Sequence, residues 1–192
     1  MDYYSGEKVT VEFYRNLPTH AYRLIILRVH AAGVSAVGPV ELSLFTSEPY
    51  SQTRYIYEQL RDEVGRVSFS SSSPLYFGIS PNFARHCMKG RFANTTIIMM
   101  GCDGLKGTQM AKAFIEKGAK VYISWDEDVL SSHTDTATTH LLQYLITEKQ
   151  TMKQAVDNTM KEVGPDPIDK SLLIYYPLEV GEQTIENITS EN

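Results

Sequence analysis

Short apolar runs recur along the chain, and their spacing predicts where strands form. The three densest runs lie at residues 24–29, 95–100 and 119–124. Such runs are typical of strands that a sheet buries on both faces, so we expect 24–29 to be a central strand that ends at His30. Three shorter or alternating patterns predict further strands at residues 9–13, 41–45 and 172–176. Two short strands are also expected within 66–80, around a serine-rich turn that we expect to be flexible.

Apolar residues at helical spacing predict helices between these strands. The repeat of Ile56, Leu60 and Val64 ahead of Gly65 predicts a helix of about three turns. Further helices are predicted at residues 82–88, in the segment that carries Met110, Ala113 and Phe114 and stops at Gly118, and in two pieces within 134–163. Thr151 and Gln154 match a capping box at the start of the second piece.

Strands that alternate with helices predict an α/β fold with a mostly parallel sheet and helices on both faces. The length of 192 residues, of which 42% are hydrophobic, suits one domain, which we expect over residues 1–177. The polar remainder, residues 178–192, is expected to be a disordered tail.

Composition narrows the class of protein. No apolar run approaches the ~20 residues of a membrane span, and the first residues lack the pattern of a signal peptide. A net charge of −5 without a basic stripe argues against nucleic-acid binding. Two cysteines are too few for a disulfide framework, so we expect a cytoplasmic protein that binds neither membranes nor nucleic acid.

Reactive side chains follow three of the predicted strands, at His30, Cys102 and Trp125-Asp126. Ligands and reactive groups gather at the carboxyl ends of strands in such sheets. Cys102 lies between a strand and a helix, where backbone N–H groups stabilise a thiolate or an oxyanion, and Gly101 and Gly104 allow close backbone approach. His30 could then act as the base for Cys102. The alternative is structural: a small buried cysteine at a tight turn and a hydrogen-bonded histidine.

Other site patterns are incomplete. The segment from Gly101 to Thr108 has lysine before glycine, the reverse of a Walker A loop, and the position where a thiol phosphatase holds arginine is Thr108. His86 and Cys87 are adjacent and point apart, so they do not imply a zinc site. We therefore expect no metal and no cofactor.

The order strand–His30, strand–Gly101-Cys102, strand–Ser124-Trp125 resembles the caspase-like cysteine peptidases of clan CD, over roughly residues 8–176 and most closely their CHAT, gingipain and clostripain relatives. The resemblance implies a three-layer sandwich and a catalytic dyad of His30 and Cys102. It also implies an oxyanion hole from the N–H of Cys102 and of Ala31 or Gly33, in a turn with Gly101 and Asp103. Ser124, Trp125 and Asp126 would line the substrate groove, and a carboxylate at Asp126 would favour Arg or Lys at P1.

The chain departs from that family in three ways. Two alanines precede Gly33 after the histidine, the caspase signature around the cysteine is absent, and the family's first strand-helix unit has no counterpart upstream of residue 9. We therefore expect a sheet edge that self-association or a partner chain completes. The leading hypothesis is an endopeptidase acting on a protein or peptide substrate. An inactive interaction or signalling module and another acyl-transfer enzyme remain as alternatives.

Overall fold

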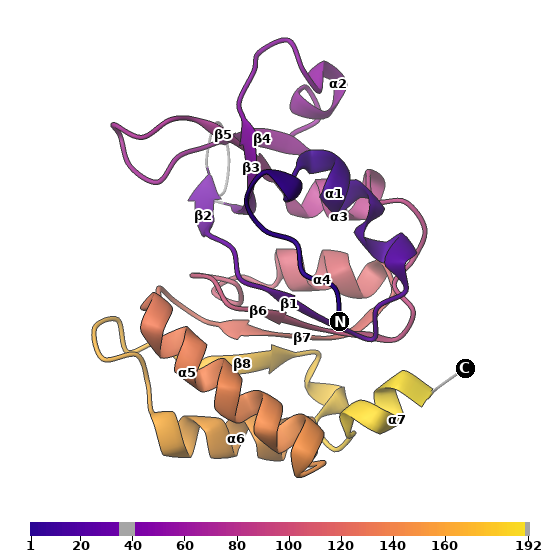
Figure 1. Cartoon of the computed structure of the whole chain (residues 1–192), viewed down its shortest axis with the longest axis vertical. Helices are drawn as coiled ribbons and strands as arrows, with labels where there is room; N and C mark the ends of the chain where they lie inside the picture. The colour runs from indigo at the N-terminus through magenta and orange to yellow at the C-terminus, as the bar shows by residue number, and fades with distance from the viewer. Residues whose placement is uncertain (35–40, 191–192) are drawn as a thin grey trace.

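The computed structural model describes residues 1–34 and 41–190, which form two four-stranded sheets (Figure 1). The strands of the first sheet, in spatial order, are β1 (Leu24–Leu27), β6 (Thr95–Met99), β7 (Ala119–Trp125) and β8 (Leu173–Tyr176). The strands of the second are β2 (Ala31–Val34), β3 (Glu41–Pro49), β5 (Tyr76–Ile79) and β4 (Val64–Val67). The first sheet is mixed, because β1, β6 and β7 are parallel and β8 is antiparallel to β7. The second sheet is antiparallel throughout.

Helices cover both faces of the first sheet (Figure 1). The side shared with the second sheet carries α1 (Val11–Asn16), α3 (Pro81–His86) and α4 (Gln109–Glu116). The other side carries α5 (Ser131–Leu142), α6 (Met152–Val163) and α7 (Ile185–Ser190). A one-turn helix, α2 (Ile56–Gln59), lies at the far end of the second sheet.

The alternation of side chains along β6 separates the two hydrophobic cores. Ile97 and Met99 are buried against the side that holds α4, whereas Ile98 and Met100 are buried against α5 and α6. Every residue of β6 is buried, as the dense apolar run predicts for a strand covered on both faces. The prediction of an α/β fold with helices on both faces of a sheet is therefore confirmed.

The first dense run does form a strand, but β1 lies at the edge of the sheet and is not central as predicted. The carbonyls of Arg23 and Leu27 accept hydrogen bonds from Thr96 and Met100 of the β6 segment. The N–H and C=O groups of one residue in a parallel strand point to the same side of the strand. Those of Leu24 and Ile26 therefore face the open edge of the sheet. Ile26 is 42% exposed. Apolar composition alone does not distinguish such an edge strand from a central one.

Residues 9–13 were expected to be a strand, and the structure corrects this to the start of α1. Thr10 caps the helix, because its hydroxyl accepts a hydrogen bond from the N–H of Phe13 at 3.1 Å. The carboxylate of the buried Glu48 accepts from the N–H of Val11 at 3.2 Å. Both contacts provide acceptors for N–H groups that, in a strand, would instead donate to a neighbouring strand. A short apolar-polar alternation also fits the first turns of a helix when a capping side chain precedes it.

The predicted three-turn helix over Ile56, Leu60 and Val64 is also wrong. Only α2 forms there, Leu60 is exposed, and Val64 is buried at the start of β4. Left-handed backbone at Tyr55 and Asp62, with φ of 54° at both, ends the helix on either side. The two short strands expected within 66–80 do form, as β4 and β5, and Gly65 lies inside β4 where it follows no helix.

The end of the chain is more ordered than its polar composition predicts. The capping box of Thr151 and Gln154 is present at the start of α6. Beyond β8, residues expected to be frayed form α7, and Ile188 of that helix is completely buried. Residues 191–192 of the predicted tail lie outside the described part of the chain. Among the described helices, none combines the length and the apolar character that crossing a membrane would require.

Candidate active site

The structure brings His30 and Cys102 to one small pocket of about 90 Å³. His30 follows β1 and Cys102 follows β6, so each lies just beyond the carboxyl end of one of two paired parallel strands. The pocket is lined by Arg28, Val29, His30, Met100, Gly101, Cys102, Val129, Ser131 and Thr134. His30 and Cys102 therefore both line this pocket, and their action as a dyad stays a prediction.

Gly101 allows the two strand ends to approach each other. A Cβ at this position would lie 2.3 Å from the carbonyl oxygen of Val29, the residue before His30. It would also lie 2.9 Å from Cε of Met99. Because the nearest contact is backbone, no side-chain rotation relieves it, and only glycine fits between Cys102 and the β1 end.

The sulfur of Cys102 contacts the backbone of the loop after β7. Sγ accepts a hydrogen bond from the N–H of Val129 at 3.5 Å and lies 3.6 Å from the Val129 carbonyl oxygen. Burial raises the pKa of the Cys102 thiol, the Val129 backbone opposes this, and Asp128 and Asp103 raise the pKa further. The backbone donor on the sulfur comes from the β7 loop and not from the turn after the cysteine, since α4 begins only at Gln109.

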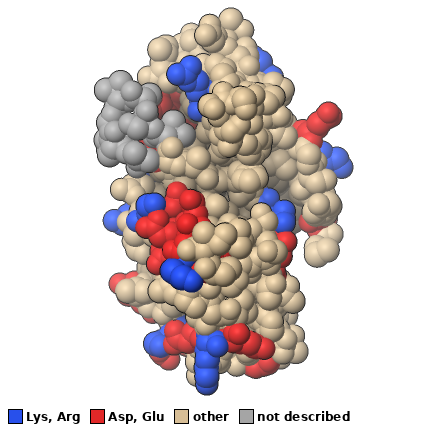
Figure 2. Space-filling view, turned by 90° about the vertical axis from the view of Figure 1, so that its left-hand side faces the viewer, with Lys and Arg blue, Asp and Glu red and all other residues tan. Residues whose placement is uncertain are grey.

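Acidic side chains lie near Cys102 but outside the pocket lining, in which the charged residue is Arg28, ion-paired with Asp135. Asp103, Glu127 and Asp128 lie close enough that burial, and then the charges of Asp128 and Glu127, raise the pKa of Asp103. Lys106 offsets part of this charge, at 2.5 Å from Glu127 and 3.4 Å from Asp103. Figure 2 shows acidic atoms gathered in one patch with basic atoms at its border. The site therefore carries excess negative charge beside the thiol.

His30 lies exposed at the junction of the two sheets, with its backbone tied to the second sheet. Its carbonyl accepts a hydrogen bond from the N–H of Phe45 at 2.9 Å. The imidazole packs edge-on against the ring of Phe69, with centroids 4.8 Å apart, and against Phe45 at 6.0 Å. The imidazole is thus held among aromatic rings on the side of the pocket away from the acidic cluster.

The residues expected to supply oxyanion donors after the histidine lie in β2. Ala31 pairs with Leu44 and Gly33 with Leu42 in an antiparallel register. Hydrogen-bonded and non-hydrogen-bonded pairs alternate along an antiparallel ladder. His30 and Phe45 form a hydrogen-bonded pair, so Ala31 and Gly33 are in non-hydrogen-bonded pairs and their N–H groups point away from β3. Neither residue lines the pocket itself. The two alanines before Gly33 are therefore accommodated by a strand, not by a tight turn.

The three residues expected to line a substrate groove do not line this pocket. Ser124 is fully buried, and its hydroxyl donates to the carbonyl of Met99 at 2.7 Å. Trp125 is also fully buried, and its indole N–H donates to the hydroxyl of Thr134 at 2.9 Å. The Asp126 carboxylate accepts from the N–H of Leu172 at 2.7 Å and joins the start of β8 to the loop after β7. All three positions make structural contacts.

Sequence reasoning missed the pocket residues that come from the β7–α5 segment. Val129, Ser131 and Thr134 close the site from that side, and the positive end of the α5 dipole lies there. The sequence partly indicated these residues, because the segment follows the third dense strand and the carboxyl ends of parallel strands lie at the same edge of a sheet. The sequence could not show that Trp125 holds Thr134 against the site.

The other cysteine has a different environment. The thiol of Cys87 donates a hydrogen bond to the buried carboxylate of Glu63 at 3.0 Å, and His86 approaches the same carboxylate at 3.3 Å. Burial and the Glu63 carboxylate raise the pKa of Cys87 to about 12. Cys87 is therefore a poor nucleophile at neutral pH and serves as an internal control for Cys102.

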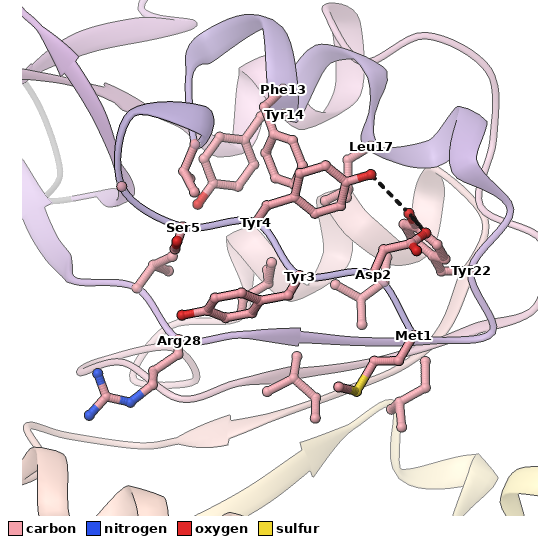
Figure 3. Close-up of a pocket in the computed structure, with 17 residues that line it drawn as sticks. Met1, Asp2, Tyr3, Tyr4, Ser5, Phe13, Tyr14, Leu17, Tyr22 and Arg28 are labelled. Carbon is pink, nitrogen blue, oxygen red and sulfur yellow. Dashed lines mark hydrogen bonds between the residues drawn. The ribbon is translucent and has the colours of Figure 1, made fainter.

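A larger cavity of about 460 Å³ lies between the N-terminal segment and the open edge of β1 (Figure 3). Its walls are mostly aliphatic and tyrosine side chains. The Tyr22 hydroxyl hydrogen-bonds to the Asp2 carboxylate at 2.5 Å and to the Tyr4 hydroxyl at 3.2 Å. The lining contains no cysteine or histidine, so this cavity offers no nucleophile–base pair. It marks the open sheet edge, whose pairing with another chain stays a prediction.

Over residues 1–34 and 41–190, no group of three or more His, Cys, Asp or Glu side chains is placed to hold a metal ion. Comparison with models of known protein families gives no match to this chain, and comparison with curated protein sequences gives none either. The geometry at Cys102 and His30 is therefore the basis for assigning a function.

Replacing Asp128 by asparagine is expected to make Cys102 more reactive. The negative charge of Asp128 disfavours the thiolate, so its removal lowers the pKa of Cys102 and shifts alkylation to lower pH. Iodoacetamide labelling followed by peptide mass spectrometry measures this at Cys102 alone, and we expect a several-fold faster reaction at pH 7. Asp157→Asn, on the exposed face of α6, is the matched control and should leave the profile unchanged. An unchanged profile for Asp128→Asn would contradict the assigned role of this charge.

Proposed function

We propose that the chain is a caspase-like cysteine endopeptidase of clan CD in which His30 and Cys102 form the catalytic dyad. The observation that carries this proposal is the shared pocket, in which an imidazole and a thiol lie beyond the ends of two paired parallel strands. The helices on both faces of the mixed sheet are compatible with the three-layer sandwich of that family. The second, antiparallel sheet supports the site by pairing with the backbone of His30.

In the proposed reaction, His30 takes the proton from the Cys102 thiol, and the thiolate attacks a peptide carbonyl carbon. In this reaction the backbone N–H of Cys102, which lines the pocket, stabilises the oxyanion, and Ala31 lies outside the lining. The C–N bond breaks as the imidazolium returns its proton to the leaving amine. Water, deprotonated by His30, then hydrolyses the thioester and restores the thiol.

Negative charge at the site supports cleavage after Arg or Lys. Asp103 and Asp128 both act on the Cys102 thiol electrostatically, and Glu127 extends the cluster. A guanidinium or ammonium group bound there would neutralise these carboxylates and also favour the thiolate. The resemblance assigned the preference for Arg or Lys to Asp126. Because the Asp126 carboxylate bonds to the N–H of Leu172, we assign this preference to Asp103, Glu127 and Asp128 instead.

A second candidate function is a caspase-like interaction module without proteolysis. Two observations favour it. Burial raises the pKa of the Cys102 thiol, and the thiol donates a hydrogen bond to the Val129 carbonyl at 3.6 Å. In such a module the thiol would be a packed side chain and the pocket would have no turnover.

Labelling by an Arg- or Lys-directed acyloxymethyl ketone tests the proposal. We expect covalent labelling of the wild-type chain and of Cys87→Ala, and none of Cys102→Ala, because Cys102 shares a pocket with His30 whereas the Cys87 thiol is bonded to the Glu63 carboxylate. His30→Gln should slow labelling by at least about a hundredfold, the usual contribution of a general base. Labelling that persists without Cys102 would refute the peptidase proposal. A Cys102 that alkylates no faster than free cysteine, with no labelling by the ketone, would establish the inert module.

A further inference from the structure

The turn between β4 and β5 holds an aromatic ring against the candidate base. Phe69 is 53% exposed, and its ring meets that of His30 edge-on at 4.8 Å. It also packs against Phe45 at 5.0 Å and Tyr76 at 5.6 Å. These rings lie outside the pocket lining and adjoin it through His30, with Phe69 exposed and Phe45 buried behind it.

The turn does not need the Phe69 ring to hold its own shape. Its serines bond to one another, with Ser70 and Ser73 hydroxyls 2.7 Å apart and the Ser68 hydroxyl donating to the Ser70 carbonyl at 3.0 Å. A phenylalanine that stays half in water forgoes about half of the free energy that full burial would provide. Such a ring beside a reactive imidazole is better explained by a ligand that covers it.

We infer that Phe69, with Phe45 behind it, forms an apolar subsite for a substrate side chain next to the cleaved bond. This inference rests on the proposed peptidase function and specifies its substrate class. The two residues have different neighbours, because Asp128 and Asp103 act electrostatically on Cys102 whereas the exposed His30 ring contacts Phe69 and Phe45. The preferred substrate is therefore a peptide with an Arg or Lys residue flanked by a bulky apolar residue.

Binding of an apolar side chain to Phe69 would also affect the base. The ring it contacts is the same one that packs on the imidazole, so an occupied subsite removes water from that face of His30. Phe69 would contact substrate directly and is thus a specificity residue. Its effect should depend on the substrate side chain, which a purely structural role would not produce.

The test compares fluorogenic peptides that carry one basic P1 residue and either leucine or glycine at P2, with a second pair varied at P1′. For the wild-type chain we expect kcat/KM about tenfold higher for leucine than for glycine at one of these positions, the usual range for one apolar contact. Phe69→Ala should abolish that preference, with kcat/KM falling about tenfold more for the leucine peptide than for the glycine peptide, and Phe69→Leu should restore most of it. Leu75→Ala is the matched control, because Leu75 is a 44% exposed apolar residue of the same turn.

The outcomes separate the two proposals. If the wild-type chain cleaves the peptides and Phe69→Ala lowers kcat/KM equally for leucine and glycine, the subsite is refuted and the peptidase stands. If Leu75→Ala removes the preference as well, a general disturbance of the turn is responsible and the subsite is again refuted. If no peptide is cleaved and the ketone does not label Cys102, the peptidase proposal itself fails.

Discussion

Gly101→Ala is expected to destabilise the chain strongly and to disable the candidate site. The added methyl group would lie 2.3 Å from the carbonyl oxygen of Val29 and 2.9 Å from Met99. Val29 is a half-buried residue just after β1 and Met99 is buried in β6, so relief requires the segment after β1 to move away from β6. Overpacking of this kind costs about 1–3 kcal/mol, and more when backbone must shift. We expect a fall in the free energy of unfolding at the upper end of that range, measured by urea denaturation.

Gly65→Ala provides the matched control. Gly65 lies in β4, and a Cβ there would meet nothing within 4 Å. This variant should unfold within about 1 kcal/mol of the wild-type chain, since alanine also reduces the freedom of the unfolded state. Ketone labelling should persist in Gly65→Ala and be lost in Gly101→Ala even where that variant remains folded. Equal stability and equal labelling of both variants would show that the two strand ends do not pack as closely as described.

Trp125→Ala is expected to have the second large effect, on stability and through it on the site. Trp125 is completely buried beneath α5, and its indole N–H donates to Thr134, which lines the pocket. Removing a buried tryptophan costs about 3–5 kcal/mol, because a cavity replaces its contacts. Thermal unfolding should show a lower Tm for this variant, together with weaker labelling of Cys102.

Trp125→Phe separates packing from the hydrogen bond. It keeps most of the buried volume but leaves the Thr134 hydroxyl without its donor, so we expect a loss of about 1–2 kcal/mol. A groove residue would behave differently, with altered KM for peptide substrates at unchanged stability. If Trp125→Ala keeps the wild-type Tm and changes only KM, the assignment of Trp125 to a substrate groove is restored and the structural role is wrong.

Two elements show how far sequence patterns reach in this chain. The run at β6 was recognisable because every one of its residues is apolar or small enough to be buried on both faces. The segment that begins at Thr10 was misassigned, because a helix of six residues offers too few turns for its period to differ clearly from alternation. There the decision came from Glu48, a residue far along the chain whose carboxylate binds the helix start.

The candidate dyad itself was predictable, whereas its surroundings were not. His30 and Cys102 could be paired from the sequence because the carboxyl ends of parallel strands meet at one rim. Phe69 could not be connected with His30, because the contact depends on how the β4–β5 turn folds over the second sheet. The same holds for Val129, which reaches the sulfur from a loop that the sequence marked only as acidic.

By itself, the sequence determined the α/β class, the positions of the dense strands of the first sheet and the places of His30 and Cys102 just after two of them, because burial and period are local properties of the chain. The tertiary structure alone decided that β1 is an edge strand, that Ser124 and Trp125 are buried, and which charges and rings surround Cys102 and His30. The reason is physical: those properties depend on contacts between residues far apart in sequence, and the pattern around one residue carries no information about which distant surface will cover it.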